Sequence, residues 1–183
     1  MGTPKALLML DSQPLIARAT AVLRPLFETI IVVTSDQSIA AAAGVAAISD
    51  IYPAKGPLAG IQAVLHHLQR PAFCVACDMP YLNAAFIRHL CAQLENHDAA
   101  VPRLNSFGEP LHAVYSPSCL PLFESELQQP RARPFDAILQ NLRVLYIGAE
   151  EARRFDPQLR MFENWNTPED VERGQHCMEL PGD

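Results

Sequence analysis

The chain is 183 residues long, with 49% hydrophobic and 19% charged residues, an ordinary balance for a globular protein with one core. Its formal charge of -6, from 14 Lys and Arg against 20 Asp and Glu, argues against a nucleic-acid partner. No apolar run approaches the roughly 18 residues of a membrane-spanning helix, so no membrane partner and a cytoplasmic location are expected. We expect a single domain over residues 1–183.

The spacing of apolar residues predicts alternating helices and strands. In chain order these are a helix over Pro14–Leu26, a strand over Thr29–Thr34, a helix over Gln37–Ala43, a strand over Ala46–Ile48, a helix over Leu58–Leu68, a strand over Ala72–Ala76, a helix over Asn83–Leu94, strands over Ala99–Pro102 and Pro110–Tyr115, helices over Pro117–Leu127 and Phe135–Leu142, and a strand over Arg143–Ile147. This order predicts an α/β fold, a three-layer sandwich with a mainly parallel sheet. Ligands of such sheets bind at the carboxyl ends of the strands.

The stretch AFCVACDMPYL, residues 72–82, allows two interpretations. Asp78 falls where the strand ends, and its carboxylate suits Mg²⁺ with a phosphate, although an Asp before Pro could simply shape a turn. Cys74 and Cys77 could instead form a metal or redox pair. Three residues apart in a strand they point to opposite faces, so we expect buried, reduced thiols.

A second candidate is Lys55–Gly60 (KGPLAG), where two glycines bracket Pro57 at the start of a predicted helix. Glycine allows close backbone approach, and a helix N-terminus favours negative charge. The same residues could equally serve a tight loop. Lys5 is a candidate cation near the chain start, although such lysines are usually solvated.

Five segments, taken together and in this order, resemble the molybdenum cofactor guanylyltransferases of the nucleotidyltransferase superfamily. They are Met1–Leu8 (MGTPKALL), Gly56–Gly60 (GPLAG), Cys77–Pro80 (CDMP), Glu109–Tyr115 (EPLHAVY) and Asn164–Asp170 (NWNTPED). The resemblance implies a Rossmann-like α/β/α sandwich. It also implies transfer of GMP from GTP to molybdopterin with Mg²⁺ as cofactor and release of pyrophosphate. Molybdoenzymes or their chaperones are implied as protein partners.

The resemblance assigns roles to particular residues. Lys5 matches a lysine that binds the GTP phosphates, and Asp78 matches an aspartate that binds Mg²⁺ and nucleotide, which makes these two the expected catalytic residues. The other expected nucleotide-binding residues are Thr34, Asp50, Gly56, Pro57 and Leu58. Asn164 and Asn166 match asparagines on the molybdopterin side.

The family pattern begins with a strand and a Gly-rich loop ahead of the segment that matches Met1–Leu8. We therefore expect a sheet whose first, central strand is missing from this chain. Three alternatives stay open: a molybdopterin cytidylyltransferase, a non-catalytic nucleotide-binding protein, and a thiol or zinc protein built on Cys74 and Cys77.

Overall fold

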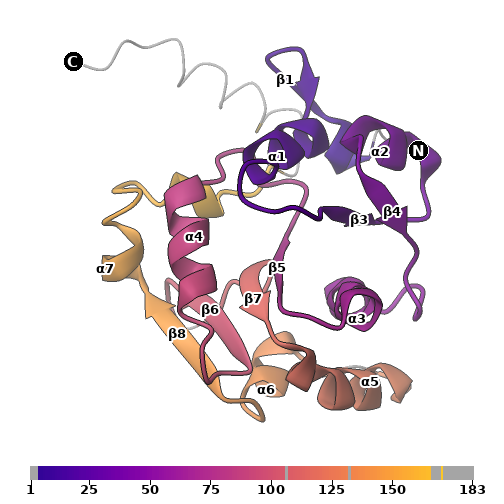
Figure 1. Ribbon diagram of the computed structural model, residues 1–183, viewed down its shortest axis with the longest axis vertical. Helices are drawn as coiled ribbons and strands as arrows, with labels where there is room; N and C mark the ends of the chain where they lie inside the picture. Colours follow the sequence, from indigo (N-terminus) through magenta and orange to yellow (C-terminus); the bar gives the residue numbers. More distant parts are fainter. Residues whose placement is uncertain (1–3, 106, 132, 166–169, 171–183) are drawn as a thin grey trace.

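The computed structural model describes residues 4–105, 107–131, 133–165 and 170 (Figure 1). The strands are β1 (Met9–Leu10), β2 (Gln13–Pro14), β3 (Ile31–Val33), β4 (Ala46–Ile48), β5 (Ala72–Val75), β6 (Ala99–Arg103), β7 (His112–Tyr115) and β8 (Val144–Gly148). The α-helices are α1 (Leu15–Leu23), α2 (Gln37–Ala43), α3 (Pro57–Leu68), α4 (Ala84–Ala92), α5 (Leu120–Gln128), α6 (Phe135–Leu139) and α7 (Ala149–Ala152). Short 3₁₀ helices are η1 (Lys5–Leu7), η2 (Pro117–Cys119) and η3 (Arg160–Phe162).

The main sheet has four strands in the spatial order β5-β7-β6-β8. β7 pairs antiparallel with both β5 and β6, whereas β6 and β8 pair in parallel, so β7 runs against the other three strands. β7 follows β6 through a loop without a helix, and such a short connection returns the chain antiparallel. The main sheet is therefore mixed: three of its four strands run in the predicted common direction, and the reversed β7 makes two of the three pairings antiparallel.

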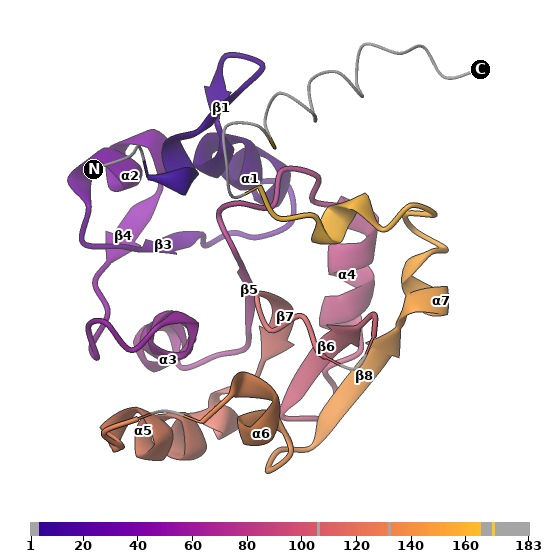
Figure 2. The ribbon, with the colours of Figure 1, turned by 180° about the vertical axis from the view of Figure 1, so that it is seen from behind.

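Helices cover both faces of this sheet. Successive strand residues point to opposite faces, so Ala99 and Val101 pack with α3, α5 and α6, whereas Ala100 packs with α4, α7 and η3. In Figures 1 and 2, α3 and α4 lie on opposite sides of β5 and β7. The predicted three-layer α/β/α sandwich is thus confirmed.

β3 and β4 form a second sheet of two parallel strands. Both lie beside α2 and apart from β5 in Figures 1 and 2. Within the described residues β3 pairs with β4 and β5 pairs with β7, and the two sheets are not joined. The break between the two sheets lies between β3 and β5.

Local sequence signals account for several helix ends. Asp36 begins α2 by accepting hydrogen bonds from the backbone N–H groups of Ser38 and Ile39, and Gly44, at a φ of 60°, ends it in the left-handed conformation. Asn83 begins α4 in the same way as Asp36 begins α2. These features match the predicted elements.

Other features differ from the prediction, and α7 is among the elements that were not predicted. The helix expected over Pro117–Leu127 is divided into η2 and α5. The hairpin β1–β2 was not predicted, because its turn uses Asp11 and Ser12, both at positive φ, in place of the glycine that usually marks such turns. The single-domain prediction stays a prediction. In the described part of the chain, no helix is long and apolar enough to cross a membrane.

A buried carboxylate joins three elements at one end of the main sheet. Asp98, just before β6, accepts hydrogen bonds from the backbone N–H of Arg143 at 2.9 Å, from its guanidinium Nη2 at 2.9 Å and from the Ser118 hydroxyl at 2.7 Å. The guanidinium hydrogen bonds hold the pKa of Asp98 below its usual range. This network fixes the starts of β6 and β8 and the η2 turn relative to one another.

We expect Asp98→Asn to lower the free energy of unfolding by about 2 kcal/mol at pH 7, because it breaks a charge-assisted network at a buried site. The loss should be largest above about pH 5 and shrink below about pH 4, where the unfolded carboxyl takes up a proton before the folded one. Urea unfolding at several pH values measures this. The control Asp11→Asn removes a surface pair with Arg18 and should cost less than about 1 kcal/mol; equal losses would contradict the assignment.

A buried histidine lies on the face of the main sheet that α4 covers. His112 on β7 is fully buried and lies against the rings of Phe73, Phe86 and Phe162, with centroid distances of 5.0–5.7 Å. Neither ring nitrogen has a hydrogen-bond partner in the structure. Burial lowers the pKa of His112 to about 3, so the ring is neutral in the folded protein.

Because the unfolded histidine takes up its proton near pH 6.5, His112 should reduce stability by about 1.4 kcal/mol for each pH unit below that value, down to its folded pKa. We expect the free energy of unfolding of His112→Leu, relative to that of the parent, to increase by about 2 kcal/mol as the pH falls from 7 to 5. Denaturant unfolding at the two pH values tests this. His67→Gln, at an exposed histidine, is the control and should leave the pH dependence unchanged. A parallel decline of parent and His112→Leu would contradict the prediction.

Candidate active site

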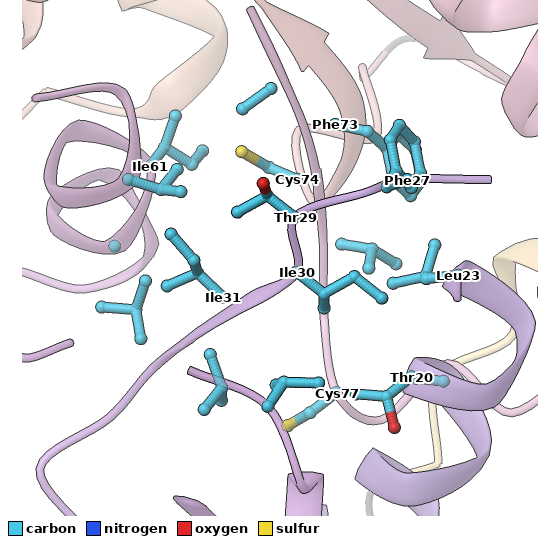
Figure 3. Close-up of a pocket in the computed structure, with 18 of the residues that line it drawn as sticks. Thr20, Leu23, Phe27, Thr29, Ile30, Ile31, Ile61, Phe73, Cys74 and Cys77 are labelled. Atoms are coloured by element: carbon cyan, nitrogen blue, oxygen red, sulfur yellow. The ribbon is translucent and has the colours of Figure 1, made fainter. Parts of the chain in front are cut away.

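A cavity of about 550 Å³ lies between β3 and β5. Figure 3 shows Thr20 and Leu23 of α1 on one side of it, Ile61 of α3 on another, and Cys74 and Cys77 along the chain of β5. The lining is mostly aliphatic and aromatic. Lys5, Asp50 and Asp78 are absent from it, so the charged candidates of the sequence lie outside this cavity.

The candidate residues instead follow the carboxyl ends of three strands. Thr34 comes directly after β3, Asp50 follows β4 by two residues, and Asp78 follows β5 by three. Strand ends at one edge of an α/β sheet are where ligands bind, because the loops there diverge and expose backbone groups. Thr34 also lines the cavity, so the rim of the cavity and this edge meet.

Lys5 and Asp78 are brought together across 73 positions of sequence. The Lys5 Nζ lies 3.8 Å from an Asp78 carboxylate oxygen, with the side chains 51% and 16% exposed. Lys5 sits in η1, which packs against α1 and α2. An ion pair with a half-exposed lysine contributes at most about 1 kcal/mol, so this pair by itself does little to oppose the arrival of an anion or a cation.

Residues 160–165 contact the loop that carries Asp78. The backbone N–H of Trp165 donates to the Asp78 carbonyl at 2.8 Å. The buried Trp165 ring meets Tyr81 edge-on at 5.5 Å, and the Arg160 guanidinium lies 4.0 Å from the centre of the Tyr81 ring. Asn164, which is exposed, therefore lies one residue from a direct contact with Asp78.

Sequence reasoning missed Trp165 and Tyr81 as supports of this loop. The signal available was the single tryptophan of the chain, placed between Asn164 and Asn166. Asn166 lies outside the described residues.

The Gly56 loop starts α3 with an unusual backbone. Gly56 has φ 72° and ψ -162°, a region that is open essentially to glycine. Pro57 takes the first helical position, where its missing N–H costs nothing, and no side chain caps the helix. The Leu58 side chain is buried in the core, so only the backbone of Leu58 can face a ligand.

Asp50 and Thr34 are two further candidates. A methyl group on Gly60 of α3 would lie 3.8 Å from the Asp50 carboxylate, which places Asp50 beside the first turns of α3. Partial burial raises the pKa of Asp50. The Thr34 hydroxyl accepts a hydrogen bond from the backbone N–H of Asp36 at 3.1 Å and so already takes part in the turn before α2.

The cysteines do not share a site. Cys74, in β5, packs in the core with α3, whereas Cys77 lies two residues beyond the end of β5 and packs beside Ala6 and α2. Burial raises the pKa of the Cys74 thiol to about 12 and also raises that of Cys77. A raised pKa disfavours the thiolate that metal binding and redox chemistry need. Among the described residues, no three potential metal ligands of the His, Cys, Asp and Glu types cluster.

Known proteins share this architecture. Residues 1–144 match the family described as the MobA-like NTP transferase domain. A relative from Peptoclostridium acidaminophilum, named probable molybdenum cofactor guanylyltransferase, is 33% identical over 93% of this chain and 80% of its own length.

Solved structures agree. The crystal structure of molybdopterin-guanine dinucleotide biosynthesis protein A from Archaeoglobus fulgidus superposes with a TM-score of 0.85 and 30% identity, covering 98% of this chain and 93% of its own. That of 4-diphosphocytidyl-2C-methyl-D-erythritol synthase from Anaerococcus prevotii has a TM-score of 0.70 over 96% and 93% of the two chains, but is only 8% identical and shares the fold alone. With a family match over most of its residues and a relative 33% identical across nearly its whole length, this chain belongs to the MobA-like NTP transferase family.

Proposed function

We propose that the protein is a molybdenum cofactor guanylyltransferase, which transfers GMP from GTP to molybdopterin and releases pyrophosphate. The observation that carries the proposal is the Lys5–Asp78 pair at the carboxyl end of β5, in a chain whose relatives bear that name. A cation and a carboxylate held 3.8 Å apart suit a reaction whose reactant and leaving group are both highly charged phosphates.

In this proposal Lys5 binds the phosphates of GTP. Its ammonium group is half-exposed on η1 and can turn from Asp78 toward a triphosphate, where it would offset the charge that builds on the leaving pyrophosphate. The weak ion pair in the free protein then keeps the lysine near its working position. Lys55, the other lysine beside the candidate loops, donates to the backbone carbonyl of Gln129 at 2.7 Å and is held away from this role.

Asp78 is proposed to bind Mg²⁺. One partly exposed carboxylate fits that ion, because Mg²⁺ usually takes one or two protein carboxylates and completes its shell with water and substrate phosphate oxygens. When bound, Mg²⁺ would neutralise charge on the α-phosphate. The hydrogen bond from Trp165 uses the Asp78 carbonyl and not its carboxylate, so it would not prevent the carboxylate from turning toward the ligand.

The nucleotide is proposed to lie along the start of α3. The Gly56 loop and the backbone N–H of Leu58 would face the negatively charged end of GTP, while Pro57 sets the direction of the helix. Asp50 can accept hydrogen bonds from the N1 and N2 donors of guanine. Thr34, at the end of β3, completes the proposed contacts.

The molybdopterin is proposed to lie on the opposite side of Asp78. Asn164, beside Trp165, and Asn166 would hold it so that its terminal phosphate attacks the α-phosphate of GTP in line. Positioning is the main requirement, since a phosphate nucleophile needs no covalent help from the protein. We further propose that the reaction takes place in the cytoplasm and that molybdoenzymes or their chaperones receive the product.

We expect protein purified from its source cells to release pyrophosphate when GTP, molybdopterin and Mg²⁺ are supplied together, and little when any one is withheld. A coupled pyrophosphate assay with GTP and CTP in parallel measures this, and mass spectrometry identifies the dinucleotide. Preference for CTP would assign the protein to the cytidylyltransferases. Binding of GTP without turnover would instead identify a non-catalytic nucleotide-binding protein.

We expect Asp78→Asn to reduce kcat/KM for GTP by about 100-fold or more, because the amide cannot neutralise or hold Mg²⁺. Stability should change by less than about 1 kcal/mol, since the lost ion pair is one with a half-exposed lysine. Initial rates across a range of Mg²⁺ concentrations, with thermal melts alongside, separate these effects. Glu95→Gln, at an exposed carboxylate after α4, is the control. A rate for Asp78→Asn within twofold of the control would exclude the proposed role.

A further inference from the structure

The loop that carries Asp78 is joined at three points to the segment over residues 155–165. The two segments run in opposite directions along each other, and the contact in the middle is the stacking of the Arg160 guanidinium on the Tyr81 ring. Arg160 is therefore held between two hydrogen bonds that fix the segment on either side of it. The three contacts are a hydrogen bond from the Trp165 N–H to the Asp78 carbonyl, the stacking of Arg160 on Tyr81, and a hydrogen bond from the Asn83 amide to the Phe155 carbonyl.

The backbone around Arg160 is also fixed. Asp156 accepts hydrogen bonds from the backbone N–H groups of Gln158 at 3.2 Å and Met161 at 2.8 Å. Leu159 takes a φ of 57°, in the left-handed region that few residues other than glycine adopt. Such a conformation persists only where the surrounding structure imposes it, and here the turn places Arg160 at the start of η3.

The Arg160 guanidinium has hydrogen-bonding capacity that the described part of the chain does not use. Its Nε lies 3.7 Å from a carboxylate oxygen of Glu163, which is an ion pair but too long for a hydrogen bond. Among the described residues the guanidinium donates no hydrogen bond, although it carries five N–H groups. Arg133 and Arg143, by contrast, each donate to a carboxylate. The Arg160 side chain is 28% exposed, so a ligand can reach it.

The proposed function, on which this inference rests, needs a cation for the attacking group. A phosphate monoester must approach a triphosphate, and two anions repel each other strongly at the short distance that in-line attack requires. Lys5 and Mg²⁺ are already assigned to GTP. Lys5 reaches the Asp78 loop from η1, whereas Arg160 reaches it from η3, so the two cations can hold two different phosphate groups.

We propose that Arg160 binds the terminal phosphate of molybdopterin, and that Tyr81 holds the guanidinium in place for it. A planar guanidinium can donate two parallel hydrogen bonds to a phosphate, which fixes the orientation of the phosphate as well as its position. Stacking on Tyr81 uses a face of the guanidinium and leaves the N–H groups, which lie in its plane, available to the ligand. Glu163, which is half-exposed, would give up its weak contact when the phosphate binds.

The first test measures binding and needs no turnover. Fluorescence titrations compare hydroxymethylpterin phosphate with hydroxymethylpterin, two ligands that differ only in the phosphate. We expect the parent to bind the phosphorylated pterin about tenfold more tightly or better, and Arg160→Gln to reduce this preference to about twofold or less. Arg160→Lys should keep part of it, because lysine retains the charge but not the paired donors. Arg154→Gln, at an exposed arginine of the same region, is the control and should behave as the parent. A parent without the preference, or an Arg160→Gln variant that retains it, would overturn the proposal.

The second test separates binding of the acceptor phosphate from a role in structure alone. We expect Arg160→Gln to raise KM for molybdopterin about tenfold or more, and to change KM for GTP by no more than about twofold. Equal increases in the two KM values, together with a lower Tm, would show that Arg160 only supports the loop.

Failure of this inference can be told apart from failure of the proposed function. A parent that binds the phosphorylated pterin through Arg160 yet releases no pyrophosphate from GTP would contradict the proposed function and support the phosphate site. Turnover by Arg160→Gln with both KM values of the parent would support the function and overturn the phosphate site.

Discussion

Pairing of backbone groups in buried strands is the constraint on which the rest of this structure depends. Each strand of the main sheet is covered by helices on both faces, so water cannot satisfy its N–H and C=O groups and neighbouring strands must do so. The order β5-β7-β6-β8 meets that requirement within the sheet. Among the described residues β3 pairs with β4 and β5 pairs with β7, and an apolar cavity lies between the two sheets.

The main sheet fixes the position of the Asp78 loop, although Asp78 itself is not part of a strand. Asp78 follows β5, whose pairing with β7 continues to the hydrogen bond between Ala76 and Leu111, so the loop begins from a fixed point. Trp165 then holds the Asp78 carbonyl from the other side. The Asp78 carboxylate forms a weak ion pair with the half-exposed ammonium of Lys5, which suits a group proposed to exchange that partner for a cation during binding.

Much of the fold follows from the spacing of apolar residues along the sequence. The strand and helix over Ala46–Ile48 and Gln37–Ala43 occur with the predicted bounds, because alternation, helix caps and the glycine stop are local signals. The hairpin β1–β2 was missed because Asp11 and Ser12 adopt positive φ without glycine. The antiparallel direction of β7 was not predicted either, since direction depends on which neighbour a strand finds.

The sequence by itself determined the layered α/β architecture and the placement of Thr34, Asp50 and Asp78 after strand ends. These are consequences of short-range periodicity and of residues that cannot continue a strand. Only the tertiary structure decided that Lys5 meets Asp78, that Leu58 is turned into the core, that Trp165 supports the Asp78 loop, and that β3 and β5 border a cavity. Contacts between distant segments depend on how whole layers pack, and that packing has no counterpart in the local pattern of a sequence.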